Sequence, residues 1–292
     1  GGGVDDGAQY GADDVGDAVS ALRLDVCLET VFNWLPAEER IGKIAEAGCR
    51  AVELWLHDDT CYRAGVEGPT RKDAAAMRQA CARHGVAVCS LVINGPTGEP
   101  GGAPVRAEEV NRYLERVEEV IGFAAGIGCR MGITCTGNRQ PELTPLRMRA
   151  NLETALGRAA EIAARHDFLL VLEALNTRVD HHGYYLDASR EGFEIVRAIN
   201  SPHLKLLYDC YHMQIMEGNL IATATANLAD IGHIHAAGVP GRHEVFAGEI
   251  SYSALIAALA AEGYAGYVGL EYLPAMEDHG ASLRETLAYL RG

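Results

Sequence analysis

The sequence predicts an α/β protein built as a single (β/α)8 TIM barrel. Eight strand-like apolar runs alternate with helix-like segments, and such alternation favours a parallel sheet. The eight units follow one another with no obvious break, which favours closure into a barrel over an open doubly wound sheet. The chain has 292 residues, close to the length of roughly 250 residues that is typical of this fold.

The predicted strands are short apolar runs. They cover residues 24–29, 51–56, 86–93, 130–135, 168–173, 204–209, 231–236 and 266–271. The clearest predicted helices are 36–48, 107–125, 146–165 and 253–262. The two longest of these have apolar residues at three- and four-residue spacing. The first starts at Pro36 and stops at Gly48, as helix ends prefer.

Two segments are predicted to lie outside the regular elements. Residues 1–22 are rich in Gly, Asp and Ala without periodicity, which predicts a flexible tail or an added expression segment. The catalytic barrel domain then spans 23–292. Residues 94–104 are rich in Gly and Pro and follow the third strand, so they are expected to form a loop at the barrel mouth that could cover a substrate.

Composition excludes several classes of function. The chain is 48% apolar and 22% charged, as in ordinary soluble proteins, and its net charge of -15 argues against a nucleic-acid partner. It has no apolar run long enough for a membrane span, no signal-peptide pattern and no nucleotide-binding glycine motif. The eight cysteines are scattered without metal-ligand spacing, so we expect reduced thiols and a cytoplasmic protein. Homo-oligomerisation is left open.

Four residues stand where predicted strands end: Glu173, Asp209, His235 and Glu271. The C-terminal ends of barrel strands meet at one mouth, where active sites are built. Three carboxylates and one imidazole there would form a mostly oxygen shell for one divalent ion such as Mn²⁺, Mg²⁺ or Co²⁺. The two glutamates could also move protons. The alternative for Glu173 is a salt bridge with an arginine on a neighbouring strand.

The surrounding residues leave more than one interpretation open. His233 and His235 alternate on one strand and face the same side, so one is a candidate ligand and the other a core histidine. His212 follows Asp209 by three residues among apolar neighbours, which points it into a cavity. Arg242 lies in a Gly/Pro loop and is suited to grip a substrate oxygen. The alternative for Arg242 is a surface residue.

Several segments of the C-terminal half resemble a known family. They are Val171-Leu-Glu-Ala-Leu-Asn176, Gly183-Tyr-Tyr-Leu186, Asp209-Cys-Tyr-His-Met-Gln214, His233-Ile-His235, Val239-Pro-Gly-Arg-His-Glu244, Gly248-Glu-Ile-Ser-Tyr252 and Gly269-Leu-Glu-Tyr-Leu-Pro274. They look like the xylose-isomerase-like barrels, with the hydroxypyruvate isomerase branch nearest and the ketose 3-epimerases of the tagatose and allulose type next. The resemblance covers about 24–292 and is dense from 168 onward.

The resemblance implies an isomerase or epimerase that transfers protons on a small unphosphorylated hydroxy-carbonyl compound. One divalent metal, with manganese among the candidates, would be held by Glu173, Asp209, His235 and Glu271. The two glutamates would lie on opposite faces of the substrate carbon and pass protons, while His212 and Arg242 would bind substrate oxygens.

Two features of the sequence favour different branches of this family. Some hydroxypyruvate isomerases carry Gln where His235 stands, which favours the epimerase pattern. The loop from Val239 to Glu244 and the ending Glu-Tyr-Leu-Pro favour hydroxypyruvate isomerase.

Three other functions remain as alternatives. A lyase or hydrolase acting on a modified sugar could use the same metal and carboxylates. An endonuclease on the same type of barrel conflicts with the net charge of -15 and the lack of a basic run. A non-catalytic sugar-binding subunit would have no need of paired glutamates.

Overall fold

The computed structural model describes residues 22–55 and 72–292. The predicted N-terminal tail, apart from Leu22, and the last residue of the second predicted strand lie outside these ranges.

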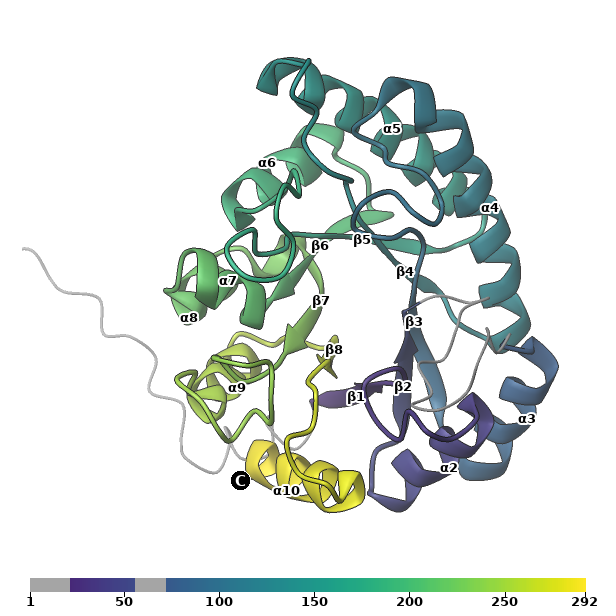
Figure 1. Ribbon diagram of the computed structural model, residues 1–292, viewed down its shortest axis with the longest axis vertical. Coiled ribbons are helices and arrows are strands. Elements are labelled where there is room, and N and C mark those ends of the chain that lie inside the picture. Colours follow the sequence, from purple (N-terminus) through teal and green to yellow (C-terminus); the bar gives the residue numbers. More distant parts are fainter. Residues whose placement is uncertain (1–21, 56–71) are drawn as a thin grey trace, which may run out of the picture.

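The predicted strands close into one parallel barrel (Figure 1). They are β1 (Arg23–Cys27), β2 (Ala51–Leu54), β3 (Ala87–Val92), β4 (Met131–Thr134), β5 (Leu169–Glu173), β6 (Leu204–Asp209), β7 (Ile231–Ala236) and β8 (Tyr267–Leu270). Each strand pairs with its neighbour in sequence, and β1 pairs with β8 to complete the circle. The predicted fold class is therefore confirmed.

Helices surround the barrel (Figure 1). They are α2 (Ala37–Glu46), α3 (Ala74–His84), α4 (Val110–Ile127), α5 (Pro145–Arg165), α6 (Ser189–Ile199), α7 (Cys210–Met216), α8 (Leu220–Ala226), α9 (Tyr252–Ala261) and α10 (His279–Arg291), with 3-10 turns η1 (Ala107–Glu109) and η2 (Leu228–Asp230). All four helices predicted from the sequence are present. The start of the segment predicted at 107–125 is the 3-10 turn η1.

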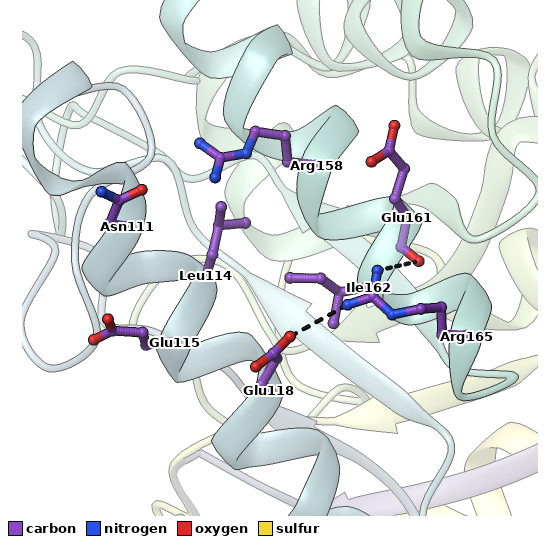
Figure 2. A pocket seen from close by; sticks show the side chains of 8 residues that line it. All are labelled: Asn111, Leu114, Glu115, Glu118, Arg158, Glu161, Ile162 and Arg165. Atoms are coloured by element: carbon purple, nitrogen blue, oxygen red, sulfur yellow. Dashed lines mark hydrogen bonds and ion pairs between the residues drawn. The ribbon is translucent and has the colours of Figure 1, made fainter.

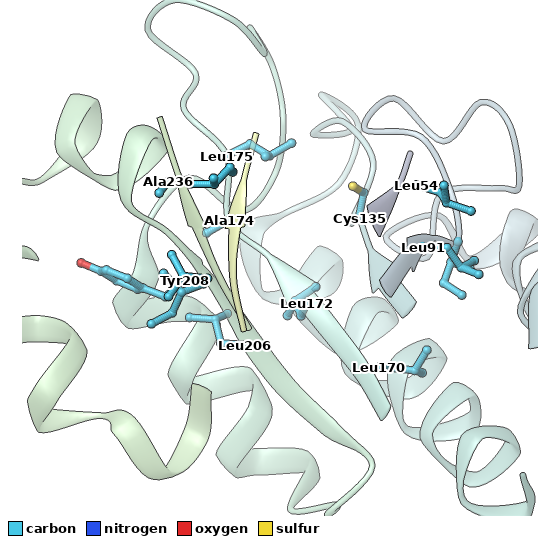
Figure 3. Close-up of a cluster of buried hydrophobic side chains, with 14 of the residues drawn as sticks. Leu54, Leu91, Cys135, Leu170, Leu172, Ala174, Leu175, Leu206, Tyr208 and Ala236 are labelled. Atoms are coloured by element: carbon cyan, nitrogen blue, oxygen red, sulfur yellow. The ribbon is translucent and has the colours of Figure 1, made fainter. Parts of the chain in front are cut away.

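The strands separate two apolar regions. Leu54, Leu91, Leu170, Leu172 and Leu206 belong to the large core in which the barrel packs against the helices (Figure 3). A smaller cluster consists of Met131, Ile133, Val171 and Leu207. Since successive side chains of a strand point to opposite faces, Val171 and Leu207 lie on the inner face while their neighbours in sequence point outward.

The inner face changes character within two residues along β5 and β6. Val171 and Leu207 belong to the apolar cluster, and the next inward positions, Glu173 and Asp209, are carboxylates at the strand ends. The alternation of inward and outward side chains along these strands therefore also places the two carboxylates at the barrel mouth. Within the two described ranges, no helix combines the length and the apolar character needed to cross a bilayer.

Candidate active site

The four strand-end residues predicted as metal ligands come together at the barrel mouth. Glu173 ends β5, Asp209 ends β6, His235 is the penultimate residue of β7, and Glu271 follows β8 directly. Each offers one ligand atom, and these four atoms all lie within 4.8 Å of one another. All four side chains are buried. Buried carboxylates at this spacing repel one another unless a positive charge lies between them.

The Nδ1 atom of His235 faces all three carboxylates. It lies 3.5 Å from Glu173 Oε1, 3.6 Å from Asp209 Oδ2 and 3.2 Å from Glu271 Oε2. Among the described residues this buried atom has no hydrogen-bond partner. One imidazole nitrogen and three carboxylate oxygens aimed at a common point suit one divalent cation. The residues present therefore fit the metal that the sequence predicts.

The two glutamates have different surroundings. Burial, reinforced by the nearby Glu271 and Asp209, raises the pKa of Glu173 to about 7 even though His235 opposes the shift. For Glu271, burial is outweighed by Arg242 and His235, which lower its pKa. Trp55 Nε1 and Arg242 Nη2 also donate hydrogen bonds to the Glu271 carboxylate. Before any cation binds, Glu173 is thus poised to exchange a proton near neutral pH, while Glu271 is held ionised.

His212 is fixed as a neutral hydrogen-bond donor. It lies in the first turn of α7, where its backbone N–H donates to Asp209 Oδ1 at 2.9 Å. Its Nδ1 accepts from the backbone N–H of Asn176 at 3.1 Å, so the ring proton resides on Nε2. Burial lowers the pKa of His212 to about 4. The Nε2 atom lies 3.8 Å from Asp209 Oδ2, has no hydrogen-bond partner among the described residues and is therefore available to a substrate oxygen.

Arg242 lies in the loop after β7, and its side chain lines the cavity at the barrel mouth. Its backbone has φ of 60°, a left-handed conformation that is uncommon for a residue with a side chain. Its guanidinium lies 5.0 Å from the centre of the Tyr211 ring, and its Nε donates to the Glu271 carbonyl oxygen at 3.2 Å. Since its side chain is only 17% exposed, Arg242 belongs to the site and not to the outer surface.

A cavity of about 270 Å³ opens beside these groups. Its described lining residues are Trp55, Val92, Gly95, Pro96, Glu99, Pro100, Cys135, Glu173, Leu175, His181, His212, Arg242 and Glu271. Four of them come from the Gly/Pro-rich loop at 94–104, which confirms that this loop lies at the mouth. The cavity brings both glutamates, His212 and Arg242 to one small space.

Three residues that contact the predicted site residues were not themselves predicted. Trp55 reaches Glu271, Asn176 fixes the ring of His212, and Glu53 accepts hydrogen bonds from His233 and His235 at 3.0 Å each. A Glu in the middle of the apolar strand β2 was a sign that could have revealed Glu53. Of the two histidines, His235 lies in the strand-end cluster, and both His233 and His235 lie in a second group with Glu53.

A second, larger hollow lies on the outside of the barrel between α4 and α5 (Figure 2). It measures about 400 Å³ and is lined by Asn111, Leu114, Glu115, Glu118, Arg158, Glu161, Ile162 and Arg165. Its Glu118–Arg165 ion pair, at 3.2 Å, is more than half exposed on both sides. Exposed ion pairs of this kind contribute little to the stability of the fold. None of the residues that line the hollow is a buried acid or base. This hollow therefore lacks the buried acids and bases that lie at the barrel mouth.

Similarity to known proteins extends over most of the chain. Residues 41–292 match the family model described as xylose isomerase-like TIM barrel. Hydroxypyruvate isomerase of Escherichia coli is 34% identical over 87% of this chain and 94% of the relative. A 2-oxo-tetronate isomerase of Cupriavidus necator is 31% identical over 85% of this chain and 91% of the relative.

Solved structures show the same barrel. The structure of a protein named AP endonuclease, family 2, from Brucella melitensis has a TM-score of 0.76 and 26% identity, over 92% of this chain and 99% of the other. An L-ribulose 3-epimerase has a TM-score of 0.75 and 19% identity, over 92% of this chain and 93% of the other. At 19% identity, the similarity to the L-ribulose 3-epimerase shows the fold alone.

Proposed function

The chain belongs to the xylose isomerase-like TIM barrel family, and on this premise we propose that it is a metal-dependent isomerase of a small, unphosphorylated hydroxy-carbonyl compound. The observation that carries the proposal is the buried His235 Nδ1, which faces three carboxylates without a hydrogen-bond partner among the described residues. A cavity with a second histidine and an arginine lies beside it. Together these groups supply a cation site, proton carriers and a substrate pocket.

Glu173, Asp209, His235 and Glu271 would hold the cation. When bound, a divalent cation stabilises negative charge that develops on the carbonyl and hydroxyl oxygens of the substrate. Manganese, magnesium and cobalt all accept such a set of oxygen ligands with one nitrogen.

The glutamates would move the proton. The hydrogen on a carbon next to a carbonyl is weakly acidic, and its removal leaves an enediolate. Glu173 is suited to remove it, because its side chain lines the cavity and, among the described residues, lacks the arginine and tryptophan contacts that hold Glu271. Return of the proton to the former carbonyl carbon, together with transfer of the hydroxyl proton from one enediolate oxygen to the other, gives isomerisation. For epimerisation one glutamate takes the proton and the other, in its protonated form, returns one to the opposite face of the same carbon.

His212 and Arg242 would stabilise the reacting oxygens. His212 is neutral and presents Nε2–H to the cavity, so it can donate to an oxygen as negative charge grows there without releasing its proton. Arg242 keeps the Glu271 carboxylate ionised and places positive charge at the same wall. We therefore assign both residues to substrate binding.

The cavity supports a small substrate without a phosphate group. At about 270 Å³ it lies at the small end of ligand pockets. Arg242 is the only Lys or Arg among its described lining residues, and it already contacts Glu271. Phosphate sites usually combine several cations or the N-terminus of a helix. The names of the two isomerase relatives favour a short hydroxy-oxo acid.

A ketose 3-epimerase is the second candidate. It is supported by the complete ligand set with His235 and by the pair of glutamates at the cavity. An endonuclease, suggested by the name of one structural neighbour, is opposed by the net charge of -15. The seven described cysteines are buried free thiols, which supports a reducing, cytoplasmic setting.

A substrate panel tests this proposal. Hydroxypyruvate, a 2-oxo-tetronate and free ketohexoses should be compared with the corresponding sugar phosphates in the presence of Mn²⁺. We expect kcat/KM to be highest for one of the unphosphorylated compounds, because the described cavity wall offers one arginine only. A clear preference for a phosphate over its free sugar would contradict the proposal.

The role of His212 can be tested by His212→Phe, which keeps an aromatic ring but removes the Nε2–H donor. The expected loss in kcat is on the order of 10²-fold, as for removal of one donor to a developing oxyanion. Mn²⁺ affinity, measured by calorimetry, should stay near that of the wild type, because His212 is not assigned as a ligand. Unchanged turnover would remove His212 from the reaction.

A further inference from the structure

Glu53 joins two histidines inside the barrel. It lies on β2, which is separated from β7 by β8 and β1 in the closed barrel, and its side chain is 2% exposed. Its Oε2 atom is 3.0 Å from both His233 Nε2 and His235 Nε2, and it accepts from Ser90 Oγ at 3.0 Å. One carboxylate oxygen therefore receives three hydrogen bonds directly behind the strand-end cluster.

This contact decides which nitrogen of His235 can serve as a ligand. An ionised carboxylate only accepts hydrogen bonds, so the His235 nitrogen that faces Glu53 must carry a proton. When the ring is neutral, its lone pair then lies on Nδ1, the atom that faces Glu173, Asp209 and Glu271. Metal-binding histidines commonly donate their second ring N–H to a carboxylate in this way.

The close approach of Glu53 to His235 depends on a glycine. Gly269 on β8 is paired with His235 in the strand register. A Cβ atom at this position would lie 2.9 Å from His235 Cδ2 and 3.0 Å from Glu53 Oε2. The first separation is shorter than real Cβ contacts and the second is tighter than most of them, so a larger residue would push the two side chains apart. Gly269 leaves the space in which they meet.

We propose that Glu53, in the space left by Gly269, is a positioning residue that sets the orientation and tautomer of His235 for cation binding. Glu53 acts through His235 and does not touch the substrate. The inference rests on the proposed function, because it assumes that His235 is a ligand.

The experiment is a calorimetric titration of the metal-free protein with Mn²⁺. Glu53→Gln keeps the shape of the side chain but removes its charge, and we expect about 10- to 100-fold weaker binding. Gly269→Ala should also weaken binding. Ser90→Ala is the matched control, since it removes a donor to the same oxygen without touching His235. It should bind Mn²⁺ like the wild type, and thermal melts of the metal-free variants report their folding.

A second measurement needs no variant. In wild-type protein with ¹⁵N-labelled histidine and bound Zn²⁺, which is diamagnetic, His235 should show a hydrogen-bonded Nε2–H and a metal-bound Nδ1. Nε2 ligation, or Glu53→Gln with wild-type Mn²⁺ affinity, would overturn the role of Glu53 alone. Absence of any Mn²⁺ binding by the wild type would instead overturn the proposed function, and this inference with it.

Discussion

Removal of divalent metal is expected to abolish turnover. The purified protein should contain or take up about one ion per chain at Glu173, Asp209, His235 and Glu271. A cation that stabilises charge on the substrate contributes several kcal/mol to the reaction, so treatment with chelator should lower kcat by about 10³-fold or more. Added Mn²⁺, Mg²⁺ or Co²⁺ should restore activity. Elemental analysis and an assay on the preferred substrate of the panel check both expectations.

The control for chelation is a check that the metal-free protein stays folded. Since most of the core lies between the barrel and the helices, away from the strand-end cluster, the circular dichroism spectrum of the metal-free protein should remain that of a folded α/β protein. Asp209→Asn offers a matched variant, because Asp209 is assigned as a ligand without a role in proton transfer. It should weaken Mn²⁺ binding and raise the metal concentration needed for activity. Full turnover in excess chelator, with no metal found, would contradict the central proposal.

The fold could be predicted from the sequence because each strand carries its own pattern. The runs at 204–209 and 231–236 match β6 and β7 residue for residue. Alternating faces and the barrel rule then place Glu173, Asp209 and Glu271 at one mouth. The errors in the predicted elements lie at the ends of helices and strands. One example is the 3-10 turn at Ala107–Glu109, where a few backbone hydrogen bonds decide the type of helix.

The site could be predicted only in part. Residues at strand ends converge by topology, and this rule found the proposed ligands. Glu53 and Asn176 act through contacts between strands and loops far apart in sequence, with separations of 182 and 36 residues to their histidine partners. A glutamate within the apolar strand β2 was a local sign of Glu53, but no local pattern identifies the histidine partner of either residue. The choice between His233 and His235 likewise depends on depth within the barrel, which periodicity along one strand does not specify.

Substitution of the two glutamates separates catalysis from binding. Glu173→Gln and Glu271→Gln each remove a proton acceptor and keep the size of the side chain and one coordinating oxygen. If both act on the substrate carbon, each should lower kcat by a factor on the order of 10² or more at saturating metal. The loss should exceed any effect of weaker Mn²⁺ binding, which is measured separately by calorimetry.

The two substitutions need not be equal in effect. Glu271 is held by Trp55 and Arg242, whereas burial raises the pKa of Glu173 to about 7 in the metal-free site. In a 1,2-isomerase one base can shuttle the proton, so Glu173→Gln should be the more damaging change. In an epimerase both should be damaging to a similar degree.

Exchange of the substrate hydrogen with deuterium from solvent distinguishes these cases. An epimerase variant with one glutamate left should still exchange the hydrogen on the carbon next to the carbonyl without inverting that centre, because one face keeps its base. An isomerase that relies on Glu173 should lose exchange in Glu173→Gln and retain it in Glu271→Gln. Wild-type turnover by both variants with metal bound would show that other groups move the proton. His212 would then be the next candidate, because its Nε2 faces the same cavity.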